Sequence, residues 1–411
     1  MTPRALPVAL RLLTLGRCLA LGACLLSLLL ILAPPARAEA KLNKAQVARL
    51  LKGQVPRLVQ GHPVQLRDPK LGRITVEPTV DSHLQRVLER QLGALKSRRA
   101  ALVLVEPSSG KVLALAGLRH GRRDPSVALD SSSPAASLFK VVTAAAALEE
   151  GELMPGSYLR YVGRAHTLYR FQVREKLRRK PQKVTLAHGF ADSNNPVFAR
   201  LGIFHLGKDV LVEYAQALGF GRALSFDLPT GPSRLVQVQS QFALGEMASG
   251  YNRETTMSPL HAALMVSVFL NGGRFPQPYL VRSLTTSNGK VAYRGRPHLS
   301  APVVTADTCQ GMQRLFAATI KEGTARKAFN RLYRDRVLKR LELGGKTGTI
   351  RGPDRRELFE WFAGYGRDPV SGRTLAVAAM VVHGKVRHAN SKRLARLVLR
   401  EAFRSQQTAR K

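Results

Sequence analysis

The hydrophobic positions of this chain change period from one segment to the next, and each period predicts an element. Between residues 84 and 92, apolar side chains recur every three or four positions behind Asp81, which predicts a helix with Asp81 as its N-cap. Two continuous apolar runs follow at 101–105 and 112–116. A turn sequence that ends in Gly110 separates them, so the two runs are predicted to form a β-hairpin.

The rest of the chain is mainly helical in its middle and rich in strands near its end. Helical periods predict helices at 197–201, 210–218, 257–270, 306–320 and 391–403. Short apolar runs predict strands at 74–77, 341–350, 361–365 and 375–382. Because the three late strands can pair with the early hairpin, the pattern predicts an α+β fold with one antiparallel sheet and helices packed on it.

Residues 1–38 have the pattern of an export segment. Arginines come first, an apolar stretch follows at 18–33, and Ala36-Arg37-Ala38 matches a small-x-small cleavage site. The apolar stretch is shorter than the roughly 20 residues that a spanning helix needs, which favours a cleaved signal peptide over a membrane anchor. Both alternatives place the rest of the chain in the periplasm or at the outer face of the cytoplasmic membrane.

Composition divides the remaining chain into three parts. Residues 39–72 are basic with one short amphipathic pattern and are interpreted as a spacer, 73–404 as the folded domain, and 405–411 as a basic tail. The chain has three cysteines, and only Cys309 lies beyond the export segment. No disulfide framework, metal site or cofactor is therefore expected.

The net charge of +38 favours an anionic partner, although arginine-rich usage throughout the chain is an alternative explanation. No nucleic-acid-binding motif accompanies the charge, so nucleic acid is not expected as the partner. The basic residues are dense in the segment Arg160–Lys183, especially at Arg178, Arg179 and Lys180. This segment is interpreted as either a solvated loop or a docking surface for an anionic wall polymer or lipid.

Candidate chemistry begins at Ser137 and Lys140, three residues apart at the start of the apolar run 141–148. On a helix, this spacing places both side chains on one face. Burial would lower the pKa of Lys140, and a neutral lysine beside a serine hydroxyl is a base beside a nucleophile. A Ser-x-x-Lys pair alone also occurs by chance.

Two later motifs strengthen the catalytic interpretation of this pair: Ser193-Asn194-Asn195 and Lys346-Thr347-Gly348. Taken separately, Ser193 and Asn195 could cap the helix that follows, and the lysine motif could be an ordinary strand. The three motifs together, in this order, resemble the transpeptidase domain of penicillin-binding proteins. The resemblance runs from about Ile74 to Phe403. Two small departures are Ala136 and Leu138, where many members have Gly and Thr.

The resemblance implies a fold and a set of reacting groups. The fold is a five-stranded antiparallel sheet flanked by helices, plus an all-helical subdomain, with the active site between them. Ser137 would attack the carbonyl between two D-alanines of a peptidoglycan stem peptide, or a β-lactam. Lys140 would take the proton, and Ser193 would relay a proton to the leaving amine. The backbone N–H groups of Ser137 and Thr349 would form the oxyanion hole.

The remaining residues of the motifs would bind substrate. Asn195 would hold the substrate amide, and Lys346 would bind the terminal carboxylate with the hydroxyls of Thr347 and Thr349. Gly348 would let the substrate backbone lie close to the strand.

The function expected from the resemblance is that of a D,D-transpeptidase, and the alternatives differ in the acyl acceptor. Asn195 in Ser-x-Asn favours a penicillin-binding protein over a class D β-lactamase. A D,D-carboxypeptidase or a class D-like serine β-lactamase is the second possibility, and a catalytically silent β-lactam sensor is the third. A separate glycan-strand polymerase is an expected partner, since the chain has no room for a glycosyltransferase domain.

Overall fold

The computed structural model describes residues 42–408, except 152, 179 and 388, and the side chains of 405–408 are outside the description. The described residues from Asn43 onward form one compact unit. The predicted export segment, residues 1–38, therefore lies outside the described residues. Within the described part, no helix is long and apolar enough to cross a membrane. The predicted tail begins as a continuation of the last helix, α12 (Ser391–Thr408).

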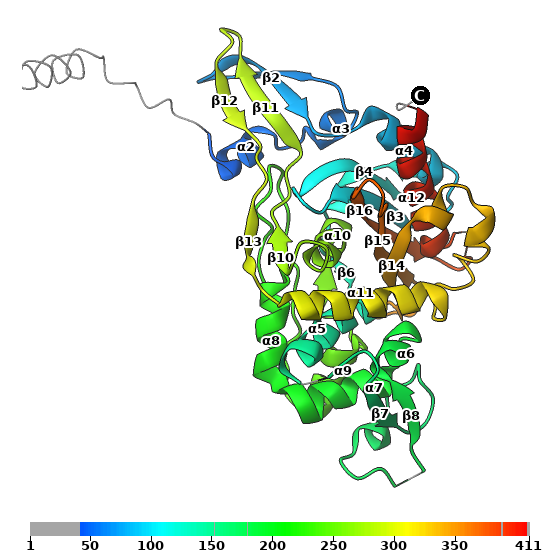
Figure 1. The fold of residues 1–411 in the computed structure, drawn as a ribbon. Coiled ribbons are helices and arrows are strands. Elements are labelled where there is room, and N and C mark those ends of the chain that lie inside the picture. Colours follow the sequence, from blue (N-terminus) through cyan, green and yellow to red (C-terminus); the bar gives the residue numbers. More distant parts are fainter. Residues whose placement is uncertain (1–41, 152, 179, 388, 409–411) are drawn as a thin grey trace, which may run out of the picture. The chain divides into compact units, whose positions relative to one another are not determined.

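The main sheet is antiparallel and has six strands in the order β14-β15-β16-β3-β4-β5 (Figure 1). Its strands are β14 (Glu342–Arg351), β15 (Leu358–Arg367), β16 (Thr374–His383), β3 (Arg99–Glu106), β4 (Lys111–Arg119) and β5 (Arg122–Arg123). The predicted hairpin and the three late strands are confirmed. The prediction of five strands was short by one, because β5 follows the tight turn at His120 and Gly121 and has only two residues, too few for a hydrophobic period.

Helices cover both faces of this sheet. On one face, α4 (Ser82–Gly93) and α12 pack against a core that includes Leu102, Phe362 and Leu399. Asp81 caps α4 as predicted, accepting hydrogen bonds from two backbone N–H groups. On the other face, α10 (Pro259–Val268) contacts β3, β15 and β16 and is buried along its whole length. Each fully buried leucine in such a core contributes about 1.5–3 kcal/mol.

A helical region lies beside the edge strand β14. Its helices are α5 (Lys140–Glu150), α6 (Leu186–Ala191), α7 (Asn195–Leu201), α8 (Gly207–Ala217), α9 (Gln241–Ser249) and α11 (Ala306–Lys321). α11 contacts both α6 and β14, so it joins this region to the sheet. α9 was not predicted, because its small and apolar residues leave no clear helical stripe. The region also holds the antiparallel pair β7 (Tyr158–Tyr161) and β8 (Gln182–Thr185). β6 (Ser133–Pro134) and β9 (Thr256–Met257) form another short antiparallel pair.

The predicted spacer is wrong from residue 44 onward, because this segment is folded. It forms α2 (Lys44–Leu50), α3 (Val55–Leu58) and β1 (Val64–Asp68), which pairs with β2 (Gly72–Pro78). β2 then pairs with β11 (Val281–Thr286), and β11 with β12 (Val291–Arg294), making a second sheet; β10 (Arg274–Pro276) and β13 (Leu299–Pro302) lie nearby as a separate pair. The local pattern could not reveal this sheet, since β11, the second partner of β2, lies about 200 residues later in the chain.

Candidate active site

Ser137 lies in a 3₁₀ turn, Ala136–Phe139, and Lys140 is the first residue of α5. The regular α-helix therefore begins at Lys140, and Ser137 lies on the turn before it. Neighbouring elements fix the turn: the Trp361 indole N–H donates to the carbonyl of Pro134 at 2.9 Å, and Ala135 N donates to Thr255 O. Ala136 has a left-handed backbone with φ 50°, which costs an L residue energy. The surrounding contacts hold Ser137 at a sharp corner.

The amine of Lys140 is enclosed by three oxygens. Its Nζ lies 3.1 Å from Ser137 Oγ, 2.6 Å from Asn195 Oδ1 and 2.5 Å from the carbonyl oxygen of Ser249, and its side chain is fully buried. Burial, and then the charge of Lys346, lower the pKa of Lys140 well below its ordinary value. A neutral amine has two N–H bonds for the two carbonyl oxygens, which leaves its lone pair for the Ser137 hydroxyl.

Ser193 and Lys346 form a second contact. Ser193 has a left-handed backbone, with φ 60°, between α6 and α7. Lys346 Nζ donates to Ser193 Oγ at 2.9 Å and to Thr347 O at 2.8 Å, and the lysine is fully buried. Burial lowers the pKa of Lys346 to about 7, while the charge of Asp192 acts in the opposite direction. A proton on this amine is therefore finely balanced at neutral pH.

The N-cap of α7 is Asn194, because its side chain accepts a hydrogen bond from Val197 N at 3.0 Å. Ser193 and Asn195, on either side, turn instead toward the two lysines. The capping alternative for Ser193 and Asn195 is thus wrong, and the two side chains are left for the site.

The lysine motif lies on β14, the edge strand of the main sheet. Lys346 pairs with Ala363 of β15, and the opposite edge of β14 has no strand partner in the sheet. A Cβ added to Gly348 would lie 3.4 Å from Ala135 O and from Leu138 N, so the strand runs against the Ser137 turn. Thr349 follows as an exposed residue. The edge of β14 beside Ser137 can accept an extended peptide as a further strand.

Sequence reasoning assigned no role to three further residues. Ser249 contributes only a backbone carbonyl, which no side-chain pattern signals. A Cβ on Gly250 would lie 2.0 Å from Ala136 O, so a glycine is required for α9 to approach the Ser137 turn. Thr324 Oγ1 lies 2.6 Å from Thr347 Oγ1 and donates to Ala191 O, which orients the Thr347 hydroxyl. Among the described residues, no group of His, Cys, Asp and Glu could hold a metal ion.

A family model decides the relationship of this chain to known proteins. The model described as the penicillin-binding protein transpeptidase domain matches residues 100–403. The chain belongs to this family. Stage V sporulation protein D of Bacillus subtilis is 26% identical over 311 residues, which cover 68% of this chain and 45% of that protein. Peptidoglycan D,D-transpeptidase PbpA of Mycolicibacterium smegmatis is 26% identical over 353 residues, covering 77% and 69%. The chain thus spans less than half of the first relative's length.

Solved structures of penicillin-binding proteins share the fold. The D,D-transpeptidase domain of a peptidoglycan glycosyltransferase from Eggerthella lenta superposes with a TM-score of 0.64 at 21% identity, covering 85% of this chain and 91% of that one. Penicillin-binding protein A from Mycobacterium tuberculosis, as its imipenem acyl-enzyme complex, gives 0.62 at 22% identity, covering 80% and 79%. The predicted arrangement of an antiparallel sheet with helices and a helical region is confirmed by these similarities and by the fold itself.

Proposed function

We propose that this penicillin-binding protein is a serine D,D-transpeptidase of peptidoglycan, acylated on Ser137. The observation that carries the proposal is the buried Lys140 amine, 3.1 Å from Ser137 Oγ, with two carbonyl oxygens as its other partners. Membership of the family and the name of the relative PbpA support the same activity.

Acylation begins when Lys140 takes the Ser137 proton and Oγ attacks the carbonyl between two D-alanines of a stem peptide. The N–H groups of Ser137 and Thr349 stabilise the oxyanion, and each such donor typically contributes about 10²–10³ in rate. The proton then passes to the leaving D-alanine nitrogen through the Ser193 hydroxyl. The C–N bond breaks and an ester on Ser137 remains.

Substrate binding follows from the position of the lysine motif at a sheet edge. The peptide lies along β14, with its terminal carboxylate at Lys346, Thr347 and Thr349, and Asn195 holds its amide. An incoming carboxylate favours the charged form of Lys346 and raises its pKa from about 7. The site therefore binds a proton together with an anionic substrate when the pH is above neutral.

In the second half-reaction, an amine of another stem peptide attacks the ester and forms the cross-link. Water as the acceptor would instead make the protein a D,D-carboxypeptidase, or a β-lactamase when the ester comes from a β-lactam. Incubation with a stem pentapeptide and an amine acceptor, followed by analysis of the peptide products, distinguishes these outcomes. A cross-linked product supports the proposal, and hydrolysed tetrapeptide alone contradicts it.

Acylation is tested separately with a fluorescent penicillin on a denaturing gel. The wild type is expected to give a covalent band and Ser137→Ala to give none. A band of equal strength in Ser137→Ala would place the nucleophile elsewhere. A silent β-lactam sensor would also give the covalent band, because the labelling needs no acceptor. The product analysis above is therefore needed to separate the sensor from the enzyme.

We further propose that the protein works outside the cytoplasmic membrane, where its substrate lies, with a separate glycan-strand polymerase. The segment Arg160–Lys183 would contact an anionic wall polymer or lipid. It spans β7 and β8, and Asn195 N donates to Ala165 O at 2.6 Å, so the segment borders the site. Replacing Arg178 and Lys180 by glutamine is expected to weaken sedimentation with isolated cell walls; unchanged sedimentation would leave a solvated loop.

A further inference from the structure

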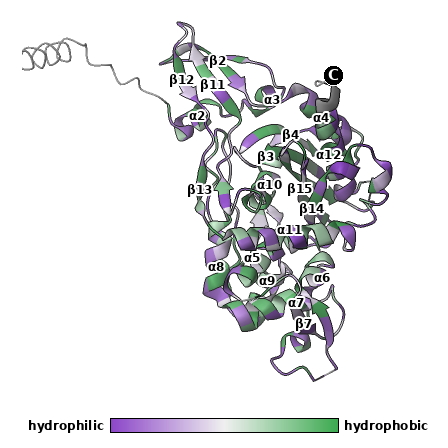
Figure 2. Cartoon of the chain, viewed as in Figure 1, coloured by the Kyte–Doolittle hydropathy of each residue, from purple (hydrophilic) through white to green (hydrophobic). Residues whose placement is uncertain are grey.

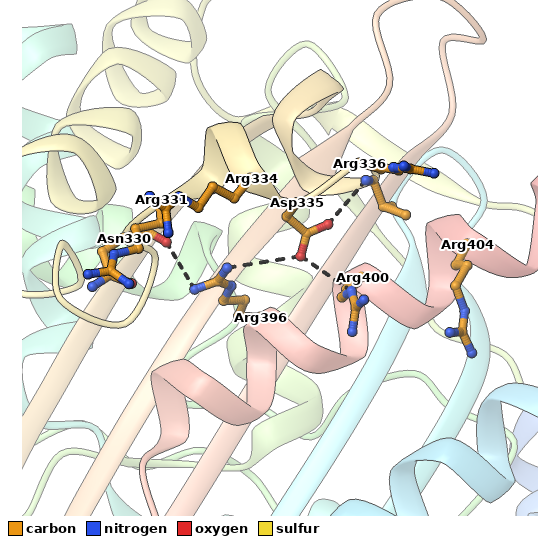
Figure 3. Close-up of a pocket in the computed structure, with 9 residues that line it drawn as sticks. Asn330, Arg331, Arg334, Asp335, Arg336, Arg396, Arg400 and Arg404 are labelled. Atoms are coloured by element: carbon orange, nitrogen blue, oxygen red, sulfur yellow. Dashed lines mark hydrogen bonds and ion pairs between the residues drawn. The ribbon is translucent and has the colours of Figure 1, made fainter.

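A hollow of about 630 Å³ lies between the segment 330–337 and α12 (Figure 3), and none of the residues that line it belongs to the three motifs. The segment belongs to the connection from α11 to β14. We call this feature the arginine hollow, because six of the residues that line it are arginines: Arg331, Arg334, Arg336, Arg396, Arg400 and Arg404. This volume falls in the range of about 300–1,000 Å³ that is usual for small-ligand sites.

One wall of the arginine hollow is a row of guanidinium groups on α12. Arg396, Arg400 and Arg404 are spaced four residues apart, so their side chains lie on one face of the helix. The opposite face of α12 is buried in the core through residues such as Val398 and Leu399. Burial of that face fixes the rotation of the helix, and the arginine row cannot turn away from the hollow.

The other wall is the segment 330–337, which lies in a mainly hydrophilic part of the chain in Figure 2. Arg331, Arg334 and Arg336 are exposed, and none of them makes an ion pair within the described part of the chain. Arg331 also has a left-handed backbone, with φ 53°, a conformation that costs a non-glycine residue energy. The fold therefore holds three cations that no described carboxylate neutralises against the row on α12; the guanidinium of Arg334 lies over the Tyr333 ring, 5.5 Å from its centroid.

The lining residues include a single carboxylate, that of Asp335. Its Oδ1 already accepts hydrogen bonds from Val337 N and Leu338 N at 3.1 Å each. Its Oδ2 lies 3.3 Å from Arg400 Nε and 4.0 Å from an Arg396 nitrogen. Arg400 Nε nevertheless makes no hydrogen bond. A second carboxylate, that of Glu401 just outside the lining, pairs with Arg404 at 2.6 Å and lies 3.9 Å from Arg400. Two carboxylates cannot neutralise six guanidinium groups, so the arginine hollow retains a net positive charge.

We propose that the arginine hollow binds a multivalent anion that carries phosphate groups. Guanidinium forks match phosphate oxygens in pairs, and several forks that face one hollow can bind several oxygens at once. A single charge would leave most of the arginines unneutralised, which favours a diphosphate or polyphosphate group. Such a group can belong to a lipid headgroup or to a free polyphosphate, and this site is separate from the one that Ser137 occupies.

Calorimetric titration with inorganic tripolyphosphate tests the proposal. The variant Arg334→Gln/Arg336→Gln removes two exposed charges of the hollow, and we expect its Kd to rise at least about tenfold. The matched control is Arg86→Gln/Arg90→Gln, which removes two exposed charges from α4. Its Kd should stay within about twofold of the wild type. An equal loss in both variants would show diffuse attraction to the +38 chain and overturn the proposal, as would no binding at all.

Two further measurements locate the site and identify the source of the phosphate. Arg404→Gln, on the other wall, should weaken tripolyphosphate binding too; unchanged binding would refute a site between the two walls. Sedimentation with vesicles that contain cardiolipin, whose headgroup carries two phosphates, against phosphatidylcholine vesicles, then distinguishes the sources. Binding that tripolyphosphate displaces and the Arg334→Gln/Arg336→Gln variant loses identifies a lipid headgroup. Tripolyphosphate binding without vesicle binding identifies a free polyphosphate.

Discussion

The glycine at position 250 gives the sharpest test of how the Ser137 turn is held. Gly250 ends α9 with φ 64°, directly after Ser249, whose carbonyl accepts a hydrogen bond from Lys140. In Gly250→Ala the new Cβ would lie 2.0 Å from Ala136 O. Relief of this collision to even 3.0 Å requires about 1 Å of backbone movement. Because Ala136 precedes Ser137, the movement displaces the nucleophile, its base, or both.

The expected magnitude follows from this displacement. A misplacement of about 1 Å in a catalytic constellation can cost roughly 10²-fold in rate. A left-handed alanine by itself costs about 1 kcal/mol in stability. Gly72→Ala is the matched control, since Gly72 has φ 69° and nothing within 4 Å of its added Cβ. Both variants should lose the stability cost of a left-handed alanine, but only Gly250→Ala should also lose acylation.

The assay is the rate of labelling by a fluorescent penicillin, measured beside thermal unfolding of each variant. We expect labelling of Gly250→Ala to slow about 100-fold in protein that remains folded by circular dichroism. Gly72→Ala should label at the wild-type rate. Labelling of folded Gly250→Ala at the wild-type rate would refute the argument that the contact between α9 and the turn positions Ser137.

Three further predictions concern the polar groups of the site. Lys140→Ala should abolish penicillin labelling without unfolding the protein, and normal labelling would remove the lysine from its role as base. Asn194→Ala should lower stability by about 1 kcal/mol through the lost N-cap, whereas Asn195→Ala should mainly slow acylation; the reverse pattern in melting and labelling experiments would contradict the cap assignment. The protonated fraction of Lys346 falls as the pH rises through about 7, so the rate of acylation by an anionic substrate should fall on the alkaline side. The Asp192 charge raises that pKa, so Asp192→Asn should move the fall in acylation to lower pH. The move should be less than about one pH unit, because solvent partly screens the two charges. An unmoved pH profile would exclude the coupling between Asp192 and Lys346.

Local patterns predicted much of the main sheet because each signal lies within a few residues. The hairpin of β3 and β4, the Asp81 cap and the late strands are of this kind. The second sheet escaped prediction because β2 pairs with β11, and no local period connects residues so distant in sequence. β1 has only two apolar residues, and the amphipathic pattern of α2 covers only about two turns, which is too short to indicate a folded segment by itself.

The same distinction applies to the active site: its motif side chains could be predicted, whereas its backbone contacts could not. The motifs identified Ser137, Lys140 and Asn195, and the fold places Ser137 Oγ and Asn195 Oδ1 within hydrogen-bond distance of Lys140 Nζ. The third partner of that amine is the Ser249 carbonyl, and every residue type offers the same carbonyl. Gly250 matters through the space that it leaves empty, which becomes visible only when α9 is placed against the turn.

The most direct test of the central claim is intact mass spectrometry after mixing the protein with a stem pentapeptide that ends in D-Ala-D-Ala. We predict a mass gain equal to the peptide less one D-alanine, located on Ser137, and loss of this adduct when an amine acceptor yields a cross-linked product. Ser137→Ala should gain no mass. An adduct that persists in Ser137→Ala, or a wild type that releases D-alanine without acylation of Ser137, would contradict the proposed mechanism.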